Sequence, residues 1–243
     1  MASLSLVGWI NSLSASGLVI FGIIFGVYVM YKAKKTNAQL LYFLGLTILF
    51  AGLGWLGNLV DFMTILSTGS NMDNPRIYIL LSMVWLPLTI ICAMYVGIEL
   101  IIPERKWYIM AIYIILGVIY EIFLFVFTFS AYTIVYPSPK GSNLIDESLI
   151  FISPVGIITI IFILSVAIFL GFGFMVKAVQ SSGSIRTNFL IVSIGVFLFI
   201  VFGMLDTFGG LLPAIALVFI RIGILCSLTI MYFGFFRHLG SRE

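Results

Sequence analysis

The stretch PAIALVFIRIGILCSLTIMYFGFF, residues 213–236, is apolar along its length except for one charged residue, Arg221. A helix of about 20 apolar residues crosses the roughly 30 Å hydrocarbon core of a bilayer. The length and composition of this stretch therefore predict a membrane-spanning helix. A charge in such a helix usually faces a partner or a wet cavity, so Arg221 requires an explanation.

The rest of the chain has the same character. It is 62% hydrophobic and only 9% charged, with a mean hydropathy of +1.25, whereas soluble domains are about a quarter charged. Short connections separate seven apolar blocks, which leaves no room for a soluble catalytic or DNA-binding domain. We therefore predict an all-α integral membrane protein, a single domain over residues 1–243. Its seven transmembrane helices are expected at 12–33, 39–66, 76–102, 107–131, 150–179, 187–211 and 213–236.

The distribution of lysine and arginine predicts the orientation of this bundle. Cytoplasmic loops carry an excess of these residues. With the N-terminus outside, two basic residues lie in outer segments, Arg76 and Lys140, and nine lie in inner ones: Lys32, Lys34, Lys35, Arg105, Lys106, Lys177, Arg186, Arg237 and Arg242. We expect a multi-pass protein of the cell membrane with a cytoplasmic C-terminus. The net charge of +3 then reflects topology, and we expect no nucleic acid partner.

An internal repeat is a further expectation. Sliding the chain so that Lys32 meets Lys177 lays VMYKAKKTN on FMVKAVQSS, and the same shift brings Asp61 onto Asp206. Helices 1 to 3 and 5 to 7 would then be parallel copies, with helix 4 as a linker. Transporters with such repeats place substrate sites at the repeat interface, but receptor-like bundles share the same plan.

Three acids are predicted to lie near Arg221. Counting about 1.5 Å per residue along the helices puts Arg221, Glu121, Asp61 and Asp206 in the outer half of the bundle. Two interpretations are open. The cluster is a structural clasp that holds the helices in register, or it lines an outward-facing cavity that binds a polar ligand head, a cation or a proton.

The motif GLGWLGNLVDF brings Asp61 together with Asn58 and Gly54 on one helix face, because their spacing is close to helical. Glycines allow a second backbone to approach closely, as Gly22 and Gly26 of FGIIFG also could, and an asparagine hydrogen-bonds across such a contact. The motif indicates close helix packing. The alternative is that Asn58 and Asp61 present oxygen atoms to a ligand.

The sequence lacks the residues that several kinds of metal site and catalytic site require. The one histidine, His238, lies in the C-terminal tail, so histidine-based metal sites and serine-histidine triads are not expected. Cys92 and Cys226 are expected to behave as small apolar residues. The sequence therefore predicts neither a metal site nor an enzyme.

Seven helices with internal tryptophans invite comparison with microbial rhodopsins. A retinal Schiff base needs a lysine inside a helix, but each lysine here falls at a helix end or in a loop. We expect no covalent retinal and predict no cofactor, and a noncovalent chromophore or lipid stays an open alternative. Trp55, Trp85 and Tyr120 are the aromatic residues predicted to line a pocket.

Five segments carry a resemblance over nearly the whole chain: GLGWLGNLVDF, IELIIPERKWYI, LGVIYEIFLF, GFGFMVKAVQSSGSIR and FIRIGIL. The sequence resembles a loosely defined group of uncharacterised archaeal seven-helix membrane proteins. The resemblance implies a free-standing seven-helix protein, and it implies no particular activity.

The sequence is therefore consistent with three functions. The first is a receptor-like bundle in which Arg221, Glu121, Asp61, Asp206 and Asn58 bind or sense a small polar or amphiphilic ligand. The second is a small secondary transporter coupled to a proton or a cation. The third is a structural or lipid-interacting subunit. The expected partners are the lipid bilayer, a small-molecule or lipid ligand, and a second copy of the chain as a homo-oligomer.

Overall fold

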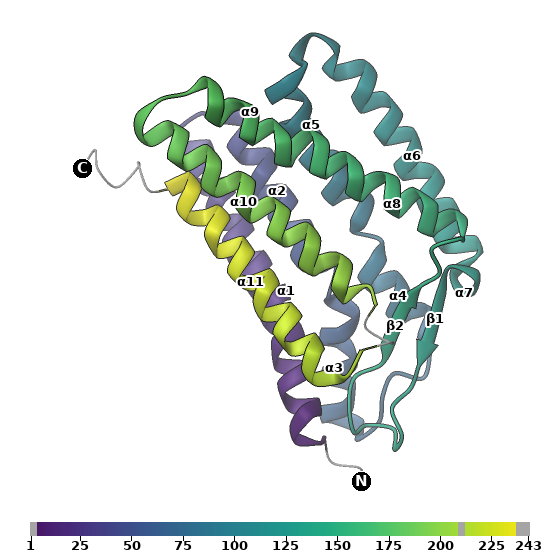
Figure 1. The fold of residues 1–243 in the computed structure, drawn as a ribbon. Helices are drawn as coiled ribbons and strands as arrows, with labels where there is room; N and C mark the ends of the chain where they lie inside the picture. Colours follow the sequence, from purple (N-terminus) through teal and green to yellow (C-terminus); the bar gives the residue numbers. More distant parts are fainter. Residues whose placement is uncertain (1–3, 209–211, 237–243) are drawn as a thin grey trace.

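Long apolar helices dominate the computed structural model, which describes residues 4–208 and 212–236. Within these residues six helices are long and apolar enough to cross a membrane, and there are seven if the pair α2 (Gln39–Leu53) and α3 (Leu56–Thr68), bent by 41° at a short break, counts as one span. The helices run side by side in one bundle (Figure 1). The expected helical membrane bundle is confirmed at this level, whereas its orientation and its repeat stay predictions.

The second, third and fifth spans are each built from more than one helical piece. The helices in chain order are α1 (Leu6–Lys35), α2 (Gln39–Leu53), α3 (Leu56–Thr68), α4 (Pro75–Met83), α5 (Leu86–Ile101), α6 (Lys106–Val126), α7 (Thr128–Ala131), α8 (Pro154–Val166), α9 (Phe172–Gln180), α10 (Gly183–Asp206) and α11 (Ala214–Phe236). A 3-10 turn, Pro103–Arg105, precedes α6, and a π-helical segment, Ala167–Gly171, joins α8 to α9.

Some ends differ from the sequence prediction, and local capping explains two of them. The first helix begins at Leu6 rather than at 12, because the Ser5 side chain accepts a hydrogen bond from the Gly8 amide. The fifth span begins at Pro154 rather than at 150, where Ser153 caps the helix in the same way. The sixth helix covers Gly183–Asp206 instead of 187–211, and residues 209–211 lie outside the described part of the chain.

A β-hairpin that the sequence prediction missed lies between the fourth and fifth spans. Strand β1 (Tyr132–Val135) pairs antiparallel with β2 (Asp146–Leu149), in a register that sets Tyr132 opposite Leu149. It lies at the end of the bundle where the N-terminus is drawn (Figure 1). The sequence prediction ended the fourth helix at residue 131 and left both strands in the connection before residue 150, because two four-residue strands form no long apolar block.

The breaks in the spans leave backbone groups without helical partners, and nearby side chains satisfy some of them. The Trp85 indole donates to the Leu81 carbonyl oxygen at 2.9 Å, beside the break between α4 and α5. The Ser193 hydroxyl on α10 donates to the Gly171 carbonyl oxygen at 2.9 Å, at the end of the π segment. Side chains therefore make these irregular backbones tolerable inside a membrane.

Close helix packing was expected at the glycines, and it is found between α1 and α2. A Cβ atom built on Gly22 would lie 2.6 Å from the Cα atom of Gly52, and one built on Gly26 would lie 2.8 Å from the Gly45 carbonyl oxygen. These glycines let the two backbones touch, as small residues do in membrane helices.

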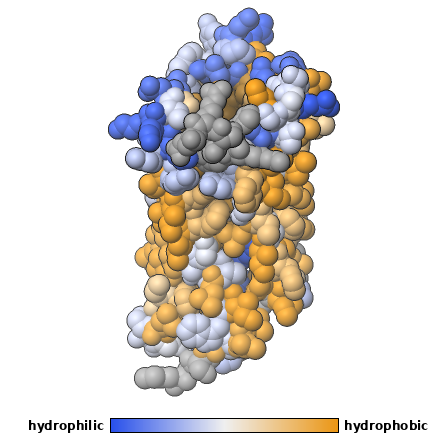
Figure 2. Space-filling model, turned by 90° about the vertical axis from the view of Figure 1, so that its left-hand side faces the viewer, coloured by the Kyte–Doolittle hydropathy of each residue, from blue (hydrophilic) through white to orange (hydrophobic). Residues whose placement is uncertain are grey.

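The outer surface matches a lipid environment. Figure 2 shows apolar residues along the middle of the molecule and hydrophilic residues gathered at the end near the C-terminus. Connections after Lys35, Ile101 and Gln180 lie at that end, which we call the basic end. The opposite end, with the N-terminus and the β-hairpin, is called the hairpin end. Trp9 and Trp107 are exposed near the two ends, where interfacial tryptophans are common.

Candidate functional site

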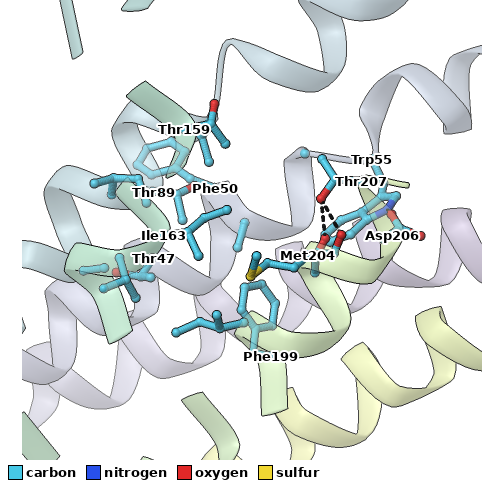
Figure 3. Close-up of a pocket in the computed structure, with 18 of the residues that line it drawn as sticks. Thr47, Phe50, Trp55, Thr89, Thr159, Ile163, Phe199, Met204, Asp206 and Thr207 are labelled. Atoms are coloured by element: carbon cyan, nitrogen blue, oxygen red, sulfur yellow. Dashed lines mark hydrogen bonds between the residues drawn. The ribbon is translucent and has the colours of Figure 1, made fainter. Parts of the chain in front are cut away.

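A cavity of about 230 Å³ lies in the middle of the bundle. Helices α2, α5, α8, α10 and α11 surround it, and the β-hairpin contributes to its wall. Most of its lining is apolar, and Figure 3 shows Phe50, Ile163, Phe199 and Met204 around it. Other apolar lining residues include Leu44, Ile48, Ile90, Ala93, Val196 and Leu228. Such a chamber suits the apolar body of a ligand.

Two carboxylates, from Asp206 and Glu147, give the cavity a polar end. Asp206 is the last residue of α10, and its Oδ2 atom accepts a hydrogen bond from the Trp55 indole at 2.8 Å. Trp55 stands at the break between α2 and α3, so that break aims the indole at Asp206. Figure 3 shows Trp55, Asp206 and Thr207 together on one side of the cavity. In the part of the chain that the structure describes, no lysine or arginine joins them in the lining.

Glu147 reaches the cavity from strand β2, and no sequence pattern pointed to it. The Tyr78 hydroxyl donates to its Oε2 atom, and the same hydroxyl accepts a hydrogen bond from the Asn58 side-chain amide at 2.9 Å. Burial raises the pKa of Glu147 to about 7 and the pKa of the neighbouring Asp146 to about 6. The Glu147 carboxyl is therefore poised to gain or lose a proton near neutral pH.

Arg221 lies behind the polar end rather than in the cavity lining. Its Nε atom is 3.3 Å from Asp206 Oδ1, and its Nη1 atom donates to the side-chain and main-chain oxygens of Asn11 on α1. The Asn11 side chain in turn donates to Asn143 Oδ1 at 3.0 Å, in the hairpin loop. Arg221 thus joins α11 to α10, α1 and the hairpin, and it compensates the charge of Asp206.

Asp61 lies outside the cavity lining, where it hydrogen-bonds to the loop after α3 and to the hairpin. Its fully buried carboxylate accepts hydrogen bonds from the backbone amides of Met72 and Ile145, at 2.8 and 2.9 Å, and from the Asn71 side chain at 2.9 Å. These partners belong to the loop after α3 and to the hairpin. The shift that aligns Asp61 with Asp206 therefore joins two residues with different partners.

Glu121 does not belong to either group. It lies on α6, which packs against α5 and α8, while Arg221 lies on α11. Among the described residues the Glu121 Oε2 atom is buried without a hydrogen-bond partner. The predicted depth was a position along the bundle axis, and depth does not say which helices are neighbours. The structure therefore brings Arg221 together with Asp206 alone among the three predicted acids.

The predicted aromatic residues have different positions. Trp55 lines the cavity, as expected. Trp85 lies outside the lining, stacked against Phe50 with ring centroids 6.1 Å apart. Tyr120 is fully buried in a separate apolar cluster, where its hydroxyl oxygen lies 3.4 Å from that of Tyr132.

Other reactive groups do not converge on this site. Within residues 4–208 and 212–236 no three His, Cys, Asp or Glu side chains are grouped as metal ligands. Cys92 is buried and Cys226 exposed, and neither forms a disulfide in this described region. Lys106 pairs with Glu99 at 2.8 Å at the basic end. His238 lies outside the described residues.

Comparison with known proteins adds no family. No protein-family model matches the chain, and no curated protein matches it. The geometry of the cavity and its polar end is therefore the guide to function.

Proposed function

We propose that this protein is a receptor-like membrane protein that binds a small amphiphilic ligand in the central cavity. The observation that carries the proposal is the division of one cavity into an apolar body and a polar end with two carboxylates. A ligand's apolar part would pack against residues such as Ile90, Ala93 and Leu228. Its polar head would lie beside Glu147 and Asp206.

The charges around the polar end favour a ligand head that donates hydrogen bonds or carries a positive charge. Asp206 already has Arg221 as an ion-pair partner, whereas the side chain that hydrogen-bonds to Glu147 is the neutral Tyr78. An ammonium or a similar donor would supply the missing partner for Glu147. Such a ligand should bind more tightly as the pH rises through about 7, because Glu147 then becomes charged.

The irregular backbone suggests how binding would be sensed. The breaks at Trp55 and near Trp85, and the π segment Ala167–Gly171, lie in spans that surround the cavity. Breaks of this kind let one half of a span move relative to the other. A ligand that fits one arrangement better would shift the helix ends at the basic end, where a partner protein would read the change.

Native mass spectrometry of protein extracted gently from its own membranes tests the proposal. We expect a stoichiometric small-molecule adduct, lost when Glu147→Leu removes the polar contact or Ala93→Phe fills the apolar body. The Asp146→Asn variant is the matched control, because Asp146 neighbours Glu147 but lies outside the lining. Bulk lipid alone on the unaltered protein would contradict the proposal, as would an adduct that both cavity variants retain.

Secondary transport is the second candidate, and the broken spans favour it. Transporters often build a mid-membrane site from discontinuous helices, and Glu147 could change protonation during a transport cycle. Flux measurements in proteoliposomes separate the two functions. Flux of the bound compound that depends on Glu147 supports transport, whereas stoichiometric binding without flux supports the receptor.

A further inference from the structure

A second, smaller cavity adjoins the central one on the side of α8 and α10. Its volume is about 50 Å³, and it shares Leu149, Ile163, Met204 and Thr207 with the lining of the central cavity. The residues that line only this smaller space are Phe151, Ile160 and Leu164. We call it the α8–α10 groove.

The groove faces the surface that lipid would cover. The side chain of Leu164 on α8 is 57% exposed, and that of Met204 on α10 is 39% exposed. These two residues therefore touch the outside of the bundle and the groove at once. The groove joins the lipid-facing surface to the wall of the central cavity.

Helix packing explains why a groove forms here. Near the basic end α10 packs against α9 and the π segment, where Ser193 binds the Gly171 carbonyl. Toward the hairpin end α8 and α10 draw apart (Figure 1), and α10 packs against α11 rather than α8. The ring of Phe151, which lines the groove, packs against the ring of Phe208 with centroids 5.1 Å apart.

The chemistry of the groove admits a hydrocarbon chain. Thr207 is its one polar lining residue in the described chain, and its hydroxyl already donates to the Gly203 and Met204 carbonyl oxygens, at 3.0 and 2.8 Å. The central cavity, at about 230 Å³, lies below the roughly 300 Å³ at which pockets for drug-sized ligands begin. One slender chain fits this space better than a lipid with two chains.

We propose that the α8–α10 groove is a side opening through which a single-chain amphiphile dissolved in the bilayer reaches the central cavity. This inference rests on the proposed function, because it requires a ligand in that cavity. It adds that the ligand comes from the membrane and not from the aqueous phase. Its polar head reaches Glu147 and Asp206 by passing between α8 and α10.

Quenching of Trp55 fluorescence tests the route. Trp9, Trp85 and Trp107 are replaced by phenylalanine, so that Trp55 in the cavity wall is the remaining tryptophan. The protein is reconstituted in phosphatidylcholine vesicles. The probe is dodecylamine brominated close to its amine, so that bromine lies beside Trp55 when the amine reaches Glu147.

Two matched double variants distinguish the groove from the rest of the lipid-facing surface. The blocked variant carries Ile160→Phe and Leu164→Phe, at positions that line the groove but not the central cavity. The control variant carries Ile157→Phe and Ile161→Phe, on exposed positions of the same helix outside both linings. Both variants receive the same added bulk on α8.

We expect quenching in the control variant at the parent rate, and quenching slowed about tenfold or more in the blocked variant, because association is slower when the route must first open. The final extent should be equal, since the central cavity is unaltered. Equal rates in the two variants would overturn the side opening alone. Absence of Trp55 quenching even in the parent would overturn the proposed binding cavity as well.

A second measurement covers the case in which the blocked variant fails to fold. Leu164→Cys is placed in a chain whose Cys92 and Cys226 are alanine, and the folded protein is then labelled with a bulky maleimide. Labelling should slow Trp55 quenching as the double substitution does. Unchanged quenching after complete labelling contradicts the side opening.

Discussion

Arg221, inside the last span, is buried and forms its contacts with other residues of the bundle. Arg221 is 4% exposed and contacts Asp206 and Asn11, while the Asp206 carboxylate faces the cavity. Of the two interpretations open from the sequence, these contacts favour a clasp for Arg221 itself. The charged residues that line the cavity are instead Asp206 and, on the hairpin, Glu147.

Replacing Arg221 with methionine should destabilise the protein strongly. The change leaves Asp206 buried without its cation, and breaking a buried pair from one side typically costs about 3 to 5 kcal/mol. Adding Asp206→Asn should restore much of the loss, because the uncompensated charge is then gone. Denaturant unfolding in detergent micelles measures both variants. A double variant no more stable than Arg221→Met would refute this account.

Glu147 should make stability depend on pH. Burial raises its pKa from 4.5 to about 7, so between these values the folded protein holds a proton that the unfolded chain has released. The free energy of unfolding should therefore fall as the pH rises through this range. Glu147→Gln should flatten the dependence, whereas the exposed Asp73→Asn should leave it unchanged. Unfolding curves at both ends of the range give the comparison, and an equal slope in Glu147→Gln would be the contrary result.

At the scale of the elements, the contact of α1 with α2 depends on glycine. A side chain at Gly22 would collide with the Gly52 backbone, as the 2.6 Å distance indicates. The helices would have to separate, and they flank the apolar cluster that contains Leu18 and Ile48. Glycine at this position is therefore a packing requirement.

Gly22→Val should lower the free energy of unfolding by about 2 kcal/mol, a typical penalty for overpacking. Gly17→Val is the matched control on the same helix, because nothing lies within 4 Å of a Cβ atom built there. It should have a much smaller effect. Thermal unfolding of the two variants under one condition tests the difference, and equal losses would show that the close approach is unimportant.

Sequence patterns predicted the spans well because hydropathy reports which segments enter lipid. They did not predict the breaks at Trp55 and near Trp85 or the π segment, since the residues there are as apolar as their neighbours. The β-hairpin was missed because its strands are only four residues long and lie in a connection between two apolar blocks. Glu147 then had no recognised place in the bundle, and one of the two cavity carboxylates could not be selected from the sequence.

At the scale of the whole molecule, side-chain hydrogen bonds tie the hairpin to the bundle. Asp61 holds the Ile145 amide, Tyr78 holds Glu147, and Asn11 holds Asn143. The sequence predicted that Asp61 and Asn58 would matter, and it placed Asp61 in the same outer half of the bundle as Arg221. The sequence could not show that these two residues connect the bundle to a hairpin. Contacts across the bundle depend on which helices are neighbours, and the sequence does not give this.

The predicted orientation can be tested with cysteine labelling. In a chain whose Cys92 and Cys226 are alanine, Lys140→Cys places a thiol at the hairpin end and Lys34→Cys places one at the basic end. Both positions are exposed. A membrane-impermeant maleimide added to intact cells should label the Lys140→Cys protein and spare Lys34→Cys until the cells are opened. The reverse pattern would place the N-terminus inside.

The link between Arg221 and Asn11 can form only after most of the chain has been synthesised. These residues are 210 positions apart, so Asn11 enters the membrane long before its partner is synthesised. Asp206 likewise waits for the final span. Insertion of α11 supplies both with their cation in one step and joins the last helix to the first. The contacts of Arg221 with Asn11 and Asp206 therefore have to wait until α11 is in place beside α1 and α10.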